Sequence, residues 1–124
     1  MQISHIAAFA FAATLCGTAI FPTHAPAADG FTRITTEAEF RQHVAGKKLM
    51  LGDNWVTGQK NGSLKGNFGG EKLKGAWAWR DGYFCRTLTT HAKDTDCQKW
   101  EIRGKESRVT RDRGKGKMFI YTSK

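Results

Sequence analysis

The chain has 124 residues, and its 20 Lys and Arg outnumber its 11 Asp and Glu, which gives a formal net charge of +9. This length leaves room for one domain and excludes a protein built on a dinucleotide-binding Rossmann unit. The basic charge predicts attraction to anionic partners such as lipid head groups, acidic polysaccharide or nucleic acid, although a charge that serves solubility alone is the alternative.

Residues 1–27 have the pattern of an export signal. An apolar run from Ile6 to Ile20 is followed by Pro22 and by Ala25-Pro26-Ala27, which places small residues where a signal peptidase cleaves. The run is about 15 residues, shorter than the roughly 20 that a spanning helix needs, so an uncleaved anchor is the less favoured alternative. We expect a mature periplasmic or secreted chain of residues 28–124 with no transmembrane segment.

Two cysteines, Cys85 and Cys97, remain in that chain once Cys16 leaves with the signal. An even pair in a small exported domain predicts a disulfide, which would stabilise the fold by roughly 3 kcal/mol in the chain-entropy model. Two cysteines without a third or a clustered set of histidines do not make a zinc site. We therefore expect neither a metal nor a cofactor.

The first element expected is a short helix over Thr36–Val44. Thr36 is an N-cap with Glu39 three residues later, which is a capping box, and Phe40 and Val44 face one way. Gly46 ends the helix. A short lead-in, 31–34, is expected to pack by Phe31 and Ile34, and the helix after it is expected to cover an opening or an edge of a sheet.

From residue 48 onward, short runs punctuated by glycine replace the helical period, which is typical of an antiparallel sheet or small barrel. Gly52, Gly66 and Gly75 lie within runs and indicate bulges or sharp bends. The sequence predicts a mainly β domain, a small antiparallel barrel or strongly curled sheet of about seven strands with one short N-terminal helix. The strands are expected at about 48–57, 63–68, 72–80, 83–89, 97–103, 107–112 and 117–122.

The pair Asp81-Gly82 predicts a type I′ hairpin turn, which fixes the register of the residues around it. Trp77 then faces Arg86, and one face of the hairpin carries Trp77, Trp79, Phe84, Arg86 and Leu88. Arg86 is the one residue there that an apolar core would not choose.

Two environments for Arg86 are compatible with this register. It either stacks on Trp77 and meets an acid such as Glu71 or Glu101, which is the favoured interpretation, or it points into a cavity and receives an anionic ligand. A cavity of that kind would have apolar walls and one fixed charge. Its candidate ligand-binding residues are Trp77, Trp79, Phe84, Arg86 and Trp100.

Two polar segments complete the chain. The loop from Thr89 to Asp96 is expected to be exposed, with His91 solvated rather than paired with an aspartate in a metal or acid-base site. The stretch 103–117 is expected to be a solvated basic hairpin, and nucleic acid is a disfavoured partner because no exposed aromatics or groove-binding helix accompany the charge. This basic patch consists of Arg103, Lys105, Arg108, Arg111, Arg113, Lys115 and Lys117.

The run Gly75-x-Trp77-x-Trp79-x-Asp81-Gly82-Tyr83-Phe84-Cys85-Arg86, with a second cysteine after it, resembles a family of small exported proteins of Gram-negative bacteria whose function is uncharacterised. The resemblance covers most of residues 31–119 and implies a compact β-rich periplasmic domain without catalytic residues to carry over. Some chains of this kind bear the label dihydrodipicolinate reductase. That activity needs a Rossmann fingerprint, which this sequence lacks.

No nucleophile with a base, carboxylate pair or phosphate-binding loop stands out in the sequence. We therefore expect a non-enzymatic binding or interaction module of the envelope that recognises an anionic small molecule or polymer. An enzyme of unrecognised type and an inhibitor of an envelope protein are the alternatives. Inhibition of lysozyme is disfavoured, because two strongly basic proteins repel each other.

Overall fold

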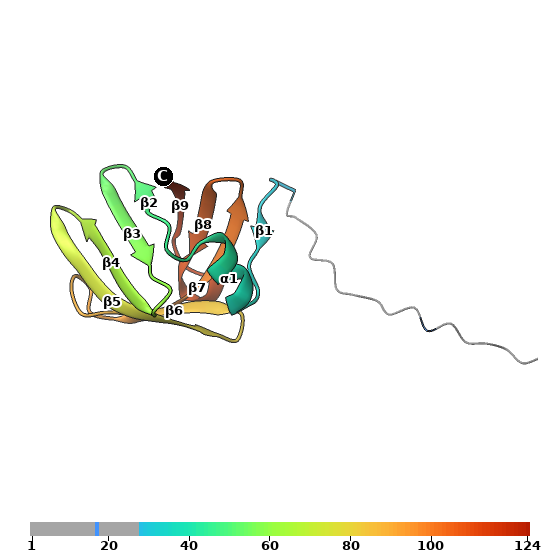
Figure 1. Ribbon diagram of the computed structural model, residues 1–124, viewed down its shortest axis with the longest axis horizontal. Coiled ribbons are helices and arrows are strands. Elements are labelled where there is room, and N and C mark those ends of the chain that lie inside the picture. The colour runs from blue at the N-terminus through green and yellow to red at the C-terminus, as the bar shows by residue number, and fades with distance from the viewer. Residues whose placement is uncertain (1–16, 18–27) are drawn as a thin grey trace, which may run out of the picture.

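The computed structural model describes residue 17 and residues 28–124, so the expected export signal, apart from residue 17, lies outside the described part of the chain. Strands dominate the described residues, and two short helices interrupt them (Figure 1). The elements in chain order are β1 (Thr32–Arg33), α1 (Glu37–His43), β2 (Leu49–Leu51), β3 (Asn54–Gly58), β4 (Ser63–Phe68), β5 (Glu71–Arg80), β6 (Tyr83–Leu88), β7 (Thr95–Arg103), β8 (Glu106–Thr110), α2 (Arg111–Gly114) and β9 (Met118–Ser123).

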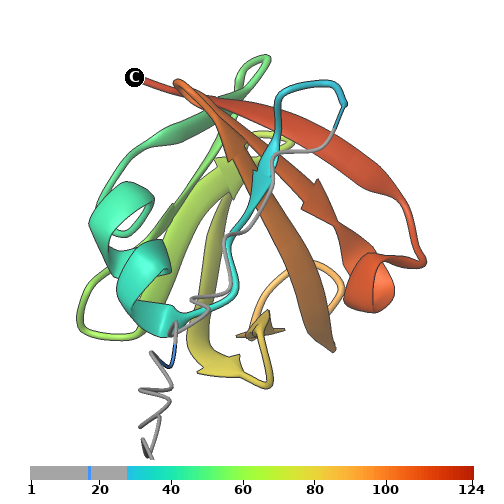
Figure 2. The same cartoon turned by 90° about the vertical axis from the view of Figure 1, so that its right-hand side faces the viewer.

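Strands β2 to β9 form a closed antiparallel barrel in which each strand pairs with the next along the chain. The barrel closes where Leu49 and Met50 of β2 pair with Ser123 and Thr122 of β9. Figure 2 shows the sheet wrapped round on itself, with β1 crossing the near side of the barrel beside α1. Strand β1 pairs with the last part of β7, beyond the part of β7 that pairs with β6. The predicted mainly β barrel with one N-terminal helix is confirmed.

The predicted count of about seven strands is too low for two local reasons. The expected strand 48–57 is two strands, because Gly52 has a φ of 62° and starts a tight turn rather than a bulge. The lead-in at 31–34 contributes β1 to the sheet. The expected strand 107–112 ends at Thr110, since Asp112 and Arg113 adopt left-handed backbone angles.

The hairpin between β5 and β6 has the register that its turn predicts. Asp81 and Gly82 both have positive φ angles, as a type I′ turn requires, and Trp77 lies opposite Arg86. Cys85 lies opposite Cys97 on β7, and the two are joined by the predicted disulfide.

Two glycines permit the tight curvature of the barrel. A Cβ on Gly66 would lie 2.2 Å from the carbonyl oxygen of Trp55, and one on Gly75 would lie 2.3 Å from that of Thr87. The predicted bends at these positions are therefore places where neighbouring strands approach too closely for any side chain.

Helix α1 closes one end of the barrel, next to the turn between β5 and β6 (Figure 1). Its N-cap Thr36 accepts a hydrogen bond from the Glu39 backbone N–H at 3.2 Å, as the capping box predicts. Phe40 is fully buried, and its ring centroid lies 4.9 to 5.6 Å from four other rings. Those rings belong to Trp77, Trp79, Phe84 and Trp100. In the described residues, no helix has the length and apolar character to cross a membrane.

Candidate ligand-binding cavity

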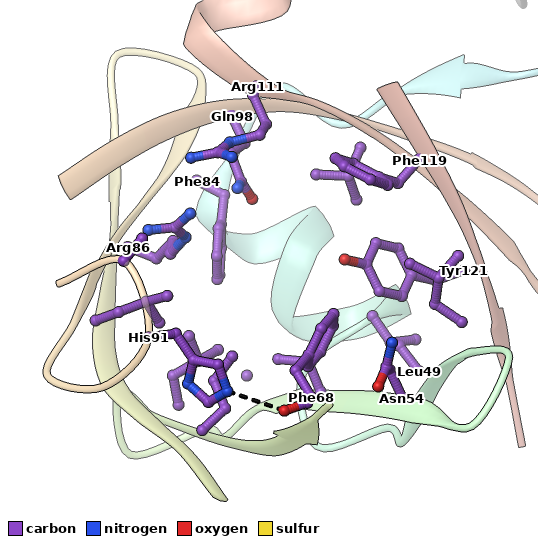
Figure 3. Close-up of a pocket in the computed structure, with 18 of the residues that line it drawn as sticks. Leu49, Asn54, Phe68, Phe84, Arg86, His91, Gln98, Arg111, Phe119 and Tyr121 are labelled. Carbon is purple, nitrogen blue, oxygen red and sulfur yellow. Dashed lines mark hydrogen bonds between the residues drawn. The ribbon is translucent and has the colours of Figure 1, made fainter. Parts of the chain in front are cut away.

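A cavity of about 390 Å³ occupies the interior of the barrel (Figure 3). Because side chains alternate along a strand, every second residue of each barrel strand points inward and contributes to its wall. Leu49, Leu64, Leu73, Leu88 and Val109 make most of this wall apolar, and all five are buried. Small-molecule sites have volumes of roughly 300–1,000 Å³, so this cavity can hold one small ligand.

The two ends of the cavity differ. The aromatic cluster around Phe40 closes the end under α1, and Phe84 and Trp100 form part of the cavity lining there. The opposite end lies beside the loop after β6, where the lining residues His91 and Ala92 are exposed to solvent. We call this exposed end the mouth of the cavity.

Polar side chains gather on one side of the cavity, toward the mouth. Arg86 of β6 and Arg111 of α2 both line it, and Figure 3 shows the Tyr121 hydroxyl pointing into the cavity from the opposite side. Burial raises the pKa of Tyr121, and the positive charges of Arg86 and Arg111 oppose that rise. The cavity therefore combines long apolar walls with one cationic side.

Asp94 bridges the two arginines with its carboxylate. Its Oδ1 accepts a hydrogen bond from Arg86 Nη1 at 2.8 Å, and its Oδ2 lies 3.3 Å from Arg111 Nη2. The hydrogen bond from Arg86 holds the pKa of Asp94 below its ordinary value, against the opposing effect of desolvation. Arg86 is only 9 % exposed, and this pairing compensates for the cost of burying its guanidinium.

Asp96 is the second carboxylate that binds Arg111. Its Oδ2 accepts hydrogen bonds from Arg111 Nε at 3.1 Å and from the Gln98 amide at 2.8 Å, and its Oδ1 accepts one from the Asp112 backbone N–H at 3.0 Å. Gln98 in turn accepts a hydrogen bond from the Trp100 indole at 3.3 Å. A continuous hydrogen-bond network thus runs from Trp100 to Arg111 at the mouth of the cavity. With Phe84, Trp100 forms the aromatic floor at the closed end.

His91 lies at the rim of the mouth and is held by the protein on both ring nitrogens. Its Nε2 is 3.0 Å from the carbonyl oxygen of Phe68, and its Nδ1 is 2.9 Å from the hydroxyl of Thr90 (Figure 3). It is exposed, as expected, and these two contacts come from a carbonyl and a hydroxyl rather than from an aspartate. Among residues 28–124 there is no group of three or more metal-ligating side chains.

The structure divides the predicted pocket residues into two groups. Phe84, Arg86 and Trp100 line the cavity, whereas Trp77 and Trp79 pack around Phe40 beneath it. The indole N–H groups of Trp77 and Trp79 donate hydrogen bonds to the carbonyl oxygens of Gln59 and Thr35, which fixes both rings at the closed end.

The favoured interpretation of Arg86 is right that the guanidinium meets an acid, but it is wrong about the stacking on Trp77 and about which acids are involved. The cation over the Trp77 ring is Arg41 of α1, at 5.1 Å, and the acids that meet Arg86 are Asp94 and Asp96. Glu101, one of the expected partners, is instead bound by Arg108. Arg86 also lines a cavity, as the alternative expected, so the same guanidinium both pairs with acids and forms part of the cavity wall.

The basic stretch 103–117 is not one uniform surface. Arg103 pairs with Glu106, Arg108 pairs with Glu101 and Asp29, and Arg111 turns into the cavity mouth. The other four members of the predicted basic patch are all exposed: Lys105, Arg113, Lys115 and Lys117. Of these, Arg113 lies beside the Tyr83 ring, 5.6 Å from its centroid.

Most of the cavity lining was not predicted from the sequence, and the missed residues include the polar side chains of Arg111, Tyr121 and Gln98. A usable signal was present, because Val109, Arg111, Phe119 and Tyr121 continue the inward alternation of their strands. That signal identifies an inward face only after the closure between β2 and β9 is known.

The fold and the cavity together define a small up-and-down β-barrel, closed at one end by a helix and carrying a cationic site at the other. Comparison of the chain with protein-family models, with curated proteins and with solved structures returns no match.

Proposed function

We propose that the protein is a non-enzymatic carrier or receptor for a small amphipathic molecule, with an apolar body and an anionic head. The observation that carries this proposal is the cavity of about 390 Å³, with its apolar wall and its pair of inward arginines. An eight-stranded barrel has an interior wide enough to hold one small ligand when its side chains do not fill it.

The apolar wall sets the chemistry of the ligand body. Burying apolar surface contributes about 25 cal/mol per Å², so a flexible hydrocarbon chain lying against Leu49, Leu73 and Val109 gains affinity in proportion to its length. The aromatic floor at Phe84 and Trp100 limits that length, because α1 closes the barrel beyond it.

The cationic side sets the chemistry of the head. Guanidinium groups present paired donors that match a carboxylate or phosphate, and the Tyr121 hydroxyl adds a further donor from the opposite wall. The overall basic charge would also favour the approach of an anion.

The same proposal places the protein in the periplasm or outside the cell, as the export pattern and the resemblance to small exported bacterial proteins imply. The Cys85–Cys97 disulfide is compatible with an oxidising compartment. The rival classes are an enzyme of unrecognised type and an inhibitor of an envelope protein. Saturable binding of one unaltered ligand per chain separates the proposed carrier from both.

The test is calorimetric titration of octanoate, decanoate and dodecanoate into residues 28–124, which contain every strand and the whole buried core of the described chain. We expect one site per chain and an affinity that rises with chain length until the cavity is full. The absence of saturable binding for all three compounds would contradict the proposal.

A matched pair of variants shows whether binding takes place inside the barrel. Leu51 lines the cavity near its mouth, whereas Met50 precedes it on the opposite face of the same strand. Leu51→Trp should weaken decanoate binding at least tenfold by filling the mouth, whereas Met50→Trp should leave it unchanged. Circular dichroism checks that both variants keep the barrel.

A further inference from the structure

The two carboxylates at the mouth of the cavity are held to very different degrees. Asp96 has a side chain that is 10 % exposed, and its oxygens accept hydrogen bonds from Gln98, Arg111 and the Asp112 backbone. Three donors from three positions in the chain keep it in place. Asp96 is therefore a permanent counter-charge of the site.

Asp94 is held by the two arginines. Its side chain is 42 % exposed, and the hydrogen bonds to its carboxylate within the described chain come from Arg86 and Arg111. Its backbone is anchored separately, because its carbonyl oxygen accepts hydrogen bonds from the Leu88 N–H at 3.0 Å and from Arg86 at 3.3 Å. The side chain can thus rotate into solvent without moving the loop.

The charges at the mouth become unbalanced when the Asp94 side chain leaves. Arg86 and Arg111 carry two positive charges, and Asp96 supplies one fixed negative charge. Without Asp94, one positive charge on a largely buried guanidinium is uncompensated, which is costly. A second carboxylate from the cavity side would restore neutrality with the same pair of donors.

We propose that Arg86 and Arg111 form the carboxylate subsite of the cavity and that the Asp94 side chain occupies this subsite until a ligand displaces it. This inference rests on the proposed function and deepens it, since it names the ligand as an apolar monocarboxylate. A neutral amphiphile has no group to replace Asp94, and a dianion brings one charge more than the site can neutralise. Asp94 is thus a built-in competitor that sets both affinity and selectivity.

The first experiment titrates decanoate and decanol into the wild-type domain and into Asp94→Asn and Asp94→Ala. Removing the competitor should raise the affinity for decanoate about tenfold, as expected for one charge-assisted contact, and should leave the affinity for decanol unchanged. Glu71→Gln is the matched control, because Glu71 is an exposed acid at the mouth end of β5. It removes the same charge and should leave both affinities unchanged.

The second experiment needs no variant. The carboxyl carbon of Asp94 is monitored by NMR through a pH titration, with and without decanoate. Displacement from Arg86 should raise the pKa of Asp94 toward its ordinary value when decanoate binds, and decanol should not change it.

The outcomes separate this inference from the proposed function. If decanoate and decanol bind equally well to all the proteins, the barrel is a binding protein but the inference fails. If Asp94→Asn and Asp94→Ala bind decanoate no better than Glu71→Gln does, or the pKa of Asp94 stays low in the complex, Asp94 is no competitor. If neither compound binds any of the proteins, both proposals are wrong.

Discussion

Arg86 gives the most informative substitution at the scale of single residues. Arg86→Ala removes a guanidinium that is 9 % exposed and leaves Asp96 with less compensation and Asp94 without its main donor. We expect the free energy of unfolding to fall by about 1–3 kcal/mol. Arg86→Lys should lie between wild type and Arg86→Ala, because lysine keeps the charge and loses the planar fork. Urea denaturation measures the difference.

Lys72→Ala serves as the control for Arg86→Ala, because Lys72 is an exposed cation on the neighbouring strand β5. It should change the free energy of unfolding by less than about 0.5 kcal/mol. Equal stability of Arg86→Ala and wild type would show that the network with Asp94 and Asp96 contributes nothing to the fold.

The position of Arg86 was predictable and its partners were not. The register comes from Asp81-Gly82, a local turn signal that places Arg86 opposite Trp77. The acids that pair with it come from the segment 89–96, whose polar composition indicates only an exposed loop. Its path back across the mouth depends on the hydrogen bond between the Leu88 N–H and the Asp94 carbonyl, which no sequence pattern reveals.

At the scale of elements, helix α1 acts through one side chain. Phe40→Ala removes a fully buried ring from the centre of an aromatic cluster, and we expect it to cost about 3–5 kcal/mol of stability. Gln42→Ala alters an exposed position of the same helix and controls for helix propensity, so it should cost nothing measurable. Thermal unfolding distinguishes them, and similar melting temperatures would mean that α1 does not close the barrel.

The strands make a second prediction at this scale. Gly75→Ala and Gly66→Ala place a Cβ within 2.3 Å of a backbone oxygen on a neighbouring strand, so we expect each to destabilise the barrel by more than about 3 kcal/mol. Gly69→Ala is the control. No atom lies within 4 Å of its Cβ position, and only its φ of 62° opposes the change, at a cost of about 1 kcal/mol. Comparable urea midpoints for all three would contradict the close strand approach.

The elements themselves were largely predictable, because the signals that define them are local. The capping box at Thr36 and the glycine turns have direct backbone reasons. The division of 48–57 into β2 and β3 was missed, since a glycine inside an apolar run is equally typical of a bulge and of a turn.

At the scale of the whole molecule, acid should weaken the fold. Burial alone would raise the pKa of Glu101, but hydrogen bonds from Arg108 and the charges of Lys99 and Arg108 outweigh burial and lower it. The hydrogen bond from Arg86 likewise lowers the pKa of Asp94. Because both carboxyls have a lower pKa folded than unfolded, their contribution to stability is present above the unfolded pKa values of about 4 and is lost as the pH falls below them.

Melting temperatures measured from neutral pH down to about pH 3 test this expectation. Glu101→Gln should lower the melting temperature at neutral pH and flatten its decline in acid, because it removes a buried partner of Arg108. Glu71→Gln, which removes an exposed carboxylate, should keep the wild-type slope. A Glu101→Gln profile parallel to that of wild type would show that this ion pair carries no pH dependence.

Closure of the barrel is the feature that sequence could indicate but not complete. Glycine-punctuated runs predict a curled sheet, yet the pairing of β2 with β9 joins segments about 70 residues apart and has no local signal. That pairing brings Tyr121 across the cavity from Arg86. It also encloses the inward faces of the strands, which line the cavity as a result. The cavity therefore depends on the long-range pairing of β2 with β9. Most residues that line it lie on strands, and nothing in the sequence marks them as cavity residues.

The central claim is that the interior of this barrel is a binding site with a defined polarity. A crystal structure of residues 28–124 grown with decanoate tests it most directly. We predict that the hydrocarbon chain lies between Leu49, Leu73 and Val109, that the carboxylate contacts Arg86 and Arg111, and that the Asp94 side chain points to solvent. An interior filled by repacked side chains, or decanoate bound only to the outer surface of the barrel, would contradict the claim.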